Sequence, residues 1–282
     1  KNENAVQVLR RRLGKPDDNY TQCTYSHHKE DKKADLWHPT LVTVVHADMR
    51  DWRPKEEDKA DILVSELLGS FGDNELSPEC LDRANHCIKS RDSISIPASY
   101  TSYLAPVANS KAWAQARDVL AGNGLHTPLV VNQHAYFQMA EAQAVFTFSH
   151  PRPSSRNDEE LDIERNNRSV LVSFGELGKG KDVTMHGFIG FFEAVLYEDK
   201  EGGDVMLSTN PATCTSLMTS WFPIFFPLEV PLTVRGDQGV SAQLWRCVSE
   251  KQRKVWYEWC LSQPTPTKIQ NVGGARYSLG LD

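Results

Sequence analysis

The sequence lacks a surplus of basic residues, a paired-cysteine motif and a long apolar run, and each absence excludes a class of protein. The net charge of -6 over 282 residues argues against a general nucleic-acid binder, which would need a basic face. Six cysteines show no paired spacing, so reduced thiols are expected. Cys23 stands near His27 and His28 without a second pair of ligands, so no metal site is predicted. No run approaches the roughly 20 apolar residues of a membrane-spanning helix.

The chain does contain two hydrophobic patterns, one after the other. At 282 residues it is long enough for one large or two ordinary domains. Residues 1–98 mix short apolar runs with helical patterns, as in α/β domains, whereas residues 99–282 carry alternating runs and one helix over 111–120. The alternating runs are 101–107, 144–148, 183–196, 232–234, 240–248 and 254–261. The predicted fold class is therefore α/β plus β, with an antiparallel β-barrel or sandwich as the second domain.

One stretch of the first domain places two acids just after a strand. The apolar run 60–64 is rich in branched residues, which predicts a buried parallel strand. Glu66 follows at its carboxyl end, where open α/β sheets hold their ligands. Two glycines let the chain turn, and Glu75 precedes a helix predicted to have Ser77 as its N-cap and to reach Ile88. We expect the loop to direct both glutamates at one small space.

Two carboxylates in one space require a cation or shifted pKa values, because like charges repel. A guanidinium meets this need well, since it is planar, always charged and binds carboxylates bidentately. The loop is therefore predicted to clamp an arginine. The alternative is that Glu66 caps a neighbouring amide while Asp73 and Glu75 form a solvated turn.

The loop sequence resembles that of a known family. Residues 65–82, SELLGSFGDNELSPECLD, resemble the double-glutamate loop of the protein arginine methyltransferases, in the form found in their symmetric-dimethylating (type II) branch. The similarity extends to residues 42–50, 220–223 and 254–259. It covers nearly the whole chain and is weaker over 110–161.

The resemblance implies a fold and an activity. Residues 1–98 would be the C-terminal part of a Rossmann-like, S-adenosylmethionine-dependent methyltransferase domain, and residues 99–282 a β-barrel for substrate binding and oligomerisation. The implied reaction transfers methyl groups to arginine guanidino nitrogens of proteins and gives symmetric dimethylarginine. The family has a glycine-rich turn and a ribose-binding glutamate upstream of the matching region. We therefore expect this chain to be a C-terminal portion that starts just after that glutamate.

The resemblance also implies cosubstrate contacts. A strand predicted over 41–47 ends in Asp48, and the matching acid in the family binds the adenine of S-adenosylmethionine, while Met49 provides an apolar contact to the ring. Glu66 is implied on the cosubstrate side as well. The alternative is that Asp48 and Met49 do not contact a cosubstrate, and that Asp48 is only a loop acid next to a methionine of the core.

The implied substrate site combines the loop with a second segment. Its residues are Glu66, Leu67, Glu75, Ser220, Trp221 and Phe222. An indole face can cover a guanidinium, at roughly 0.5 to 2 kcal/mol. Ser220 stands where the wider family has a histidine, which resembles the type II branch. The alternative is that Trp221 and Phe222 only anchor the barrel. Trp245, Trp256 and Trp259 are predicted to pack in the core.

The implied mechanism is an in-line displacement in which a guanidine nitrogen attacks the methyl of S-adenosylmethionine. Glu66 and Glu75 would be the catalytic pair, with Glu75 favoured as the proton acceptor. No metal is required.

By resemblance, the partners are arginine-containing proteins (Gly/Arg-rich segments, histones and splicing-related proteins), further copies of the chain, and a β-propeller bound mainly through an upstream part. No membrane or direct nucleic-acid contact is expected, and the expected location is cytoplasm and nucleus. One rival function is a non-catalytic interaction subunit that keeps the fold without cosubstrate binding. Another is a carboxylate-pair hydrolase, which would leave Trp221 and Asp48 unexplained.

Overall fold

The structure is a computed structural model. It describes residues 3–12, 42–90, 92–132, 135–151, 163–175, 177, 180–198, 202–216, 218 and 220–281. The described chain divides into two compact units, Lys1–Arg53 and Pro54–Asp282, and each is treated by itself. Cys23, His27 and His28 lie outside the described residues.

The first unit contains one helix among its described residues, α1 (Glu3–Arg12), where the apolar spacing predicts it. The predicted strand over 41–47 is wrong for the described part, because residues 42–47 form no strand. A strand needs a neighbour to satisfy its backbone groups. No second strand is found in the part of this unit that the structure describes.

The second unit begins with a small parallel sheet. Strand β1 (Ile62–Val64) pairs in parallel with β2 (Ile94–Ile96), as the pattern predicts. The predicted burial of β1 is wrong, because Ile62 and Val64 are 54% and 69% exposed. Among the described residues this sheet has two strands.

Helix α2 (Ser77–Ala84) connects the two strands, and Leu81 and Ala84 are buried as expected. Two details differ from the prediction. The N-cap is Leu76, in a left-handed conformation, without a side-chain cap bond, and the Ser77 hydroxyl lies 2.7 Å from Tyr100 Oη and 3.3 Å from Gly72 O. The helix ends before Ile88, in the 3-10 turn η2 (Asn85–Cys87).

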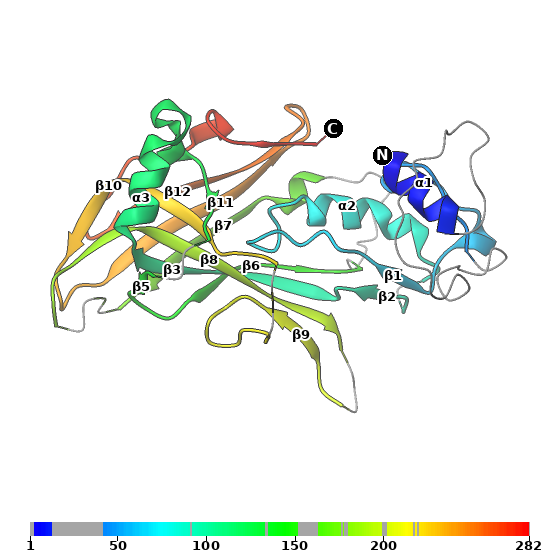
Figure 1. The fold of residues 1–282 in the computed structure, drawn as a ribbon, viewed down its shortest axis with the longest axis horizontal. Helices are drawn as coiled ribbons and strands as arrows, with labels where there is room; N and C mark the ends of the chain where they lie inside the picture. Colours follow the sequence, from blue (N-terminus) through cyan, green and yellow to red (C-terminus); the bar gives the residue numbers. More distant parts are fainter. Residues whose placement is uncertain are drawn as a thin grey trace, which may run out of the picture. The chain divides into compact units, whose positions relative to one another are not determined.

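The rest of the second unit consists of two antiparallel sheets (Figure 1). The larger has seven strands: β3 (Ser99–Ala108), β4 (Leu129–Val130), β5 (Phe137–Gln138), β6 (Gln143–Ser149), β8 (Val183–Tyr197), β9 (Val205–Ser208) and β10 (Ile224–Val234). The smaller has four: β7 (Arg168–Phe174), β11 (Val240–Ser249), β12 (Lys254–Gln263) and β13 (Leu279–Gly280). These sheets confirm the predicted β domain, in the form of two sheets around a shared core.

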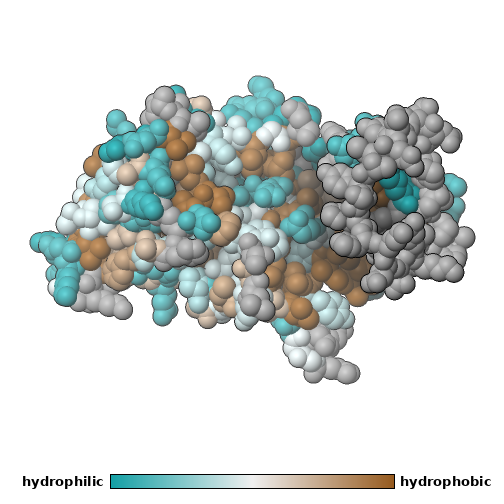
Figure 2. Space-filling view, in the orientation of Figure 1, coloured by the Kyte–Doolittle hydropathy of each residue, from teal (hydrophilic) through white to brown (hydrophobic). Residues whose placement is uncertain are grey.

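One helix and several short turns accompany the sheets. Helix α3 (Ser110–Asp118) matches the predicted helix, and Asn109 caps it by accepting from Ala112 N at 2.9 Å. The other 3-10 segments are η1 (Glu56–Asp58), η3 (Val119–His126), η4 (Ile163–Asn166) and η5 (Val272–Gly274). No helix among the described residues is both long and apolar enough to span a membrane. On the face in Figure 2, hydrophobic side chains of the second unit are interspersed with hydrophilic ones.

The loop of residues 65–76, which carries Glu66 and Glu75 and is called the acid loop below, is anchored in the core of the two sheets through Phe71. Its ring packs edge-on against Phe226 of β10, at 5.2 Å between centroids, and against Tyr257 of β12, at 5.9 Å. A Cβ added at Gly190 of β8 would lie 2.6 Å from the Phe71 ring and 2.7 Å from Ile224. Glycine at position 190 therefore makes room for the loop.

We predict that Gly190→Ala destabilises the fold by about 1–3 kcal/mol, because the added methyl overpacks the core against Phe71. Urea unfolding of wild type and variant measures the difference. Gly175→Ala is the matched control, since a Cβ there meets nothing within 4 Å, and its effect should stay within about 0.5 kcal/mol. Equal midpoints for the two variants would contradict the packing of Phe71 beneath Gly190.

Candidate active site

The loop from Ser65 to Leu76 is a closed turn that presents its two glutamates at the surface. Gly69 and Gly72 exchange backbone hydrogen bonds of 3.1 and 2.8 Å. Glu66 and Glu75 are both exposed, so water or a ligand can reach them. Leu76, directly after Glu75, has a φ of 65°, which costs a residue with a Cβ about 1–2 kcal/mol. Tertiary contacts must hold the loop in this conformation.

The charge of Glu66 acts on Glu75. Partial burial, followed by the charge of Glu66, raises the pKa of Glu75. Glu75 in turn acts on Tyr277, whose pKa is raised by burial and then by the Glu75 charge. The Glu66 charge is thus close enough to act on Glu75, a situation that a cation would relieve. The arginine clamp stays a prediction.

Trp221 is attached to the same loop. Its indole N–H donates to the carbonyl of Leu68 at 2.5 Å, and its ring packs edge-on against Phe192 of β8 at 5.8 Å between centroids. The φ of Trp221 is 60°, a left-handed conformation that bulky residues seldom adopt. Trp221 thus contacts the segment between the two glutamates, and it also packs against the sheet, as the anchoring alternative holds.

The remaining predicted substrate residues lie on these two segments. Leu67 is half-buried beside Glu66, while Ser220 and Phe222 are exposed on either side of Trp221. Their roles in substrate binding stay predictions.

The predicted cosubstrate residues Asp48 and Met49 are in the first unit and are both half-buried. Asp48 forms a bidentate pair with Arg50, with Oδ2 to Nη2 at 2.8 Å and Oδ1 to Nε at 3.0 Å. Asp48 Oδ1 also accepts from the backbone N–H of Arg50 at 2.9 Å. The adenine role stays a prediction.

A fully buried ion cluster lies beneath the loop, and sequence reasoning missed it. Arg246 of β11 donates through Nε to Asp73 Oδ2 at 2.5 Å. Its two Nη atoms bind both oxygens of Glu79 at 2.8 and 2.9 Å. Asp73 also accepts from Tyr257 Oη at 2.6 Å and Ser102 Oγ at 2.8 Å. Asp73, Glu79 and Arg246 have exposures of 0%, 1% and 0%, so the solvated-turn interpretation is wrong for Asp73.

The charges of this cluster compensate one another. Burial alone would lower the pKa of Arg246, but the charges of Glu79 and Asp73 hold it well above its usual range. Burial, followed by the charge of Asp73, raises the pKa of Tyr257 well above its usual value. Tyr257 therefore remains a neutral hydrogen-bond donor at physiological pH.

The sequence does contain a signal for this cluster. Along β11, Ala242, Leu244, Arg246 and Val248 are all buried and share one face by alternation. A charged residue in an otherwise apolar row is almost never buried unless it is paired. Trp259 of β12 is in the core as predicted, at 1% exposure. Trp245 of β11 and Trp256 of β12 are only half-buried, so the predicted core packing is confirmed for Trp259 and not for these two.

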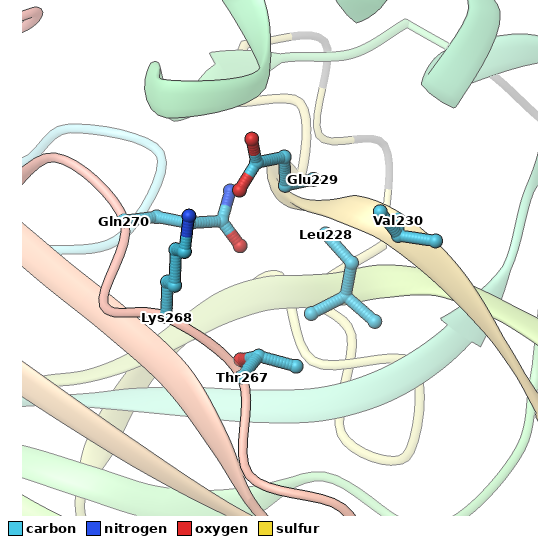
Figure 3. A pocket seen from close by; sticks show the side chains of 6 residues that line it. All are labelled: Leu228, Glu229, Val230, Thr267, Lys268 and Gln270. Atoms are coloured by element: carbon cyan, nitrogen blue, oxygen red, sulfur yellow. The ribbon is translucent and has the colours of Figure 1, made fainter.

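A separate cavity of about 320 Å³ lies elsewhere in the second unit (Figure 3). It is lined by Leu228, Glu229, Val230, Thr267, Lys268 and Gln270. It contains none of the predicted site residues. Among the described residues, no group of three or more His, Cys, Asp or Glu side chains is placed to hold a metal ion.

Solved structures show which fold this is. The chain is similar to the Trypanosoma brucei PRMT1 enzyme-prozyme heterotetrameric complex with AdoHcy, at a TM-score of 0.62 and 13% identity over 86% of this chain and 74% of that one. It is also similar to Arabidopsis thaliana protein arginine methyltransferase 10, at a TM-score of 0.59 and 15% identity over 87% and 77%. At such identities the similarity shows the fold alone. The fold is that of protein arginine methyltransferases, which confirms the predicted fold class.

The chain belongs to the PRMT5 family. A family model described as PRMT5 oligomerisation domain matches residues 99–279, and one described as PRMT5 arginine-N-methyltransferase matches residues 17–96. Protein arginine N-methyltransferase 5 of Oryza sativa subsp. indica is 44% identical over 88% of this chain and 36% of its own length. The Xenopus laevis protein of the same name is 43% identical over 85% and 36%. Protein arginine N-methyltransferase skb1 of Schizosaccharomyces pombe is 36% identical over 85% and 39%.

These matches confirm the predicted family. The chain spans between 36% and 39% of the length of the three relatives just described.

The coupling of the two glutamates gives a testable prediction. In Glu66→Gln the pKa of Glu75 should fall, because the neighbouring charge is lost, yet stay above its ordinary value, because burial is the larger cause. A pH titration of the Glu75 side-chain carboxyl by carbon-13 NMR measures this. Glu229→Gln is the control and should leave the pKa of Glu75 unchanged. The same pKa in Glu66→Gln and wild type would mean that the carboxylates do not share one space.

Proposed function

We propose that the complete protein containing this chain is a protein-arginine N-methyltransferase. It transfers methyl groups from S-adenosylmethionine to guanidino nitrogens of arginine in proteins and gives symmetric dimethylarginine. The observation that carries this proposal is a closed loop that exposes both Glu66 and Glu75 and whose Leu68 carbonyl is bound by Trp221. The family matches support the same activity.

In this proposal Glu66 and Glu75 bind the substrate guanidinium from two sides. Their negative charges draw the positive charge away from the attacking nitrogen, so they stabilise the transition state more than the ground state. Glu75, whose pKa is raised by burial and then by the Glu66 charge, is assigned as the acceptor for the proton that the nitrogen loses. The fixed loop holds the nitrogen in line for attack.

The chain's residues fit part of a site for S-adenosylmethionine, which supplies an electrophilic methyl group on a sulfonium when bound. Asp48 offers a half-buried carboxylate, and Met49 beside it offers an apolar side chain. These two would hold the adenine, and Glu66 would lie on the methyl-donor side. Trp221 would cover the substrate cation at roughly 0.5 to 2 kcal/mol, and its attachment to Leu68 ties its position to that of the loop.

The finer assignments belong to the same proposal. The methyltransferase part ends near residue 98 and the oligomerisation part begins at 99, a boundary supported by the limits of the two family matches. The substrates are arginine-containing proteins, such as Gly/Arg-rich segments, histones and splicing-related proteins. The complete protein forms homo-oligomers and binds a β-propeller partner upstream. It acts in cytoplasm and nucleus, where the free thiols of the described cysteines would stay reduced.

Replacing either glutamate by glutamine tests the catalytic assignment. We expect Glu66→Gln and Glu75→Gln in the complete protein to abolish turnover of an arginine peptide, because each removes a charge from the guanidinium site. Both side chains are exposed, so the melting temperature should not change. Methyl transfer is measured with labelled S-adenosylmethionine.

Glu229→Gln, on β10 and remote in sequence from the loop, is the control and should keep wild-type turnover. Near-normal methylation by both loop variants would remove Glu66 and Glu75 from the mechanism.

Calorimetry separates the enzyme from the rival non-catalytic subunit. The complete protein should bind S-adenosylmethionine, and Asp48→Ala should weaken that binding about tenfold or more, because a charge-assisted hydrogen bond is worth roughly 1.5–3 kcal/mol. If the wild-type protein did not bind S-adenosylmethionine, the result would favour the non-catalytic interaction subunit and contradict the proposed activity.

A further inference from the structure

The polar groups that hold the acid loop are concentrated on the residues around Glu75. Asp73, two residues before Glu75, accepts from side chains on three strands: Ser102 of β3, Arg246 of β11 and Tyr257 of β12. Glu79, four residues after Glu75, binds the same guanidinium through both of its oxygens. One arginine therefore fixes the chain on both sides of Glu75.

The exposed side chain of Glu75 depends on this backbone support. Leu76 follows it in a left-handed conformation, which persists only where surrounding contacts over-determine it. The Asp73 and Glu79 anchors lie on either side of that residue. Arg246 also reaches the Asp73 carbonyl with Nη2 at 3.4 Å and the Asn166 carbonyl with Nη1 at 3.2 Å.

Stability alone does not account for a buried ion cluster at this place. The other buried residues on the same face of β11 are apolar: Val240, Ala242, Leu244 and Val248. Well-packed apolar residues of similar volume are often as stabilising as a buried ion pair, or more so. What an ion cluster provides and an apolar contact does not is directional bonding, which selects one conformation of the loop.

We infer that Arg246 and Tyr257 are positioning residues for the proposed arginine methylation, because they hold Asp73 and Glu79 and thereby fix where Glu75 meets the substrate guanidinium. The inference rests on the proposed function. Neither side chain touches the substrate in this assignment. They act through the acid loop, from strands that follow it by more than 160 residues along the chain.

Tyr257→Phe is the decisive variant. It removes the hydroxyl that donates to Asp73 and keeps the ring that packs against Phe71 and Phe226. Arg246→Met would leave two buried carboxylates without their countercharge and is expected to unfold the protein. Ser241→Ala is the matched control, because it removes a hydrogen bond between β7 and β11, to Ser173 at 2.8 Å, that does not reach the loop.

The first readout is kinetic, in the complete protein. Tyr257→Phe should lower kcat for an arginine peptide about tenfold, since a small misplacement of a reacting group can cost up to about 100-fold. The acidic limb of its pH profile should move to lower pH, because a released Glu75 moves toward water and away from Glu66. Tyr277, the other titrating group known to interact with Glu75, stays neutral in this range. If Tyr257→Phe only made the protein less stable, its apparent kcat would fall in proportion to the folded fraction, and its pH profile would not change.

The second readout does not depend on activity. Amide hydrogen exchange of residues 69–76 should be faster in Tyr257→Phe than in wild type, while exchange in β11 and β12 stays the same. Asp73→Asn, which keeps the side-chain size and weakens the pair with Arg246, should show the same change more strongly. Ser241→Ala should leave loop exchange and the pH profile at wild-type values.

The outcomes separate this inference from the proposed function. Unchanged loop exchange and an unchanged pH profile in Tyr257→Phe would overturn the positioning role even if the wild-type protein methylates arginine. Faster loop exchange in Tyr257→Phe, together with no methyl transfer by the wild-type protein, would overturn the proposed function and with it the positioning role. The anchoring of the loop by Tyr257 would still be established.

Discussion

The fold depends on one buried guanidinium and the two carboxylates that share it. Arg246, Asp73 and Glu79 are removed from water together, which costs several kcal/mol per ion unless every charge is paired and hydrogen-bonded. The geometry meets that condition, with Nε on one carboxylate and both Nη atoms on the other. Removing one partner of such a group typically costs about 3–5 kcal/mol. The acid loop, α2 and β11 are therefore fixed relative to one another.

This arrangement divides the acids of one short segment into two kinds. Asp73 and Glu79 point into the interior, where the strands supply their donors. Glu66 and Glu75 remain at the surface, where their mutual repulsion favours a bound cation. The buried acids make the loop rigid, and a rigid loop can keep two like charges close together without letting them move apart. Trp221 contributes to the same rigidity through its bond to the Leu68 carbonyl.

Local patterns predicted most of the fold because they depend on short-range physics. Alternation over 183–196 and 254–261 predicts β8 and β12, since a strand with one buried face must alternate. The predictions that fail are those that depend on neighbours. Residues 42–47 have the composition of a strand but no partner strand in the described part of their unit. The branched residues of β1 predict burial, yet Ile62 and Val64 are exposed, because burial also requires another element to pack over the side chains.

For the candidate site, the sequence by itself determined the two glutamates, the glycines that let the loop turn, and the tryptophan, because each residue type carries its chemistry wherever it lies. The sequence also determined the family, through the residues of the acid loop. Only the tertiary structure decided that Asp73 and Glu79 are interior anchors and not surface acids. Their partner is 173 residues away from Asp73 along the chain, and a contact at that separation is set by the packing of two sheets, which no local pattern records.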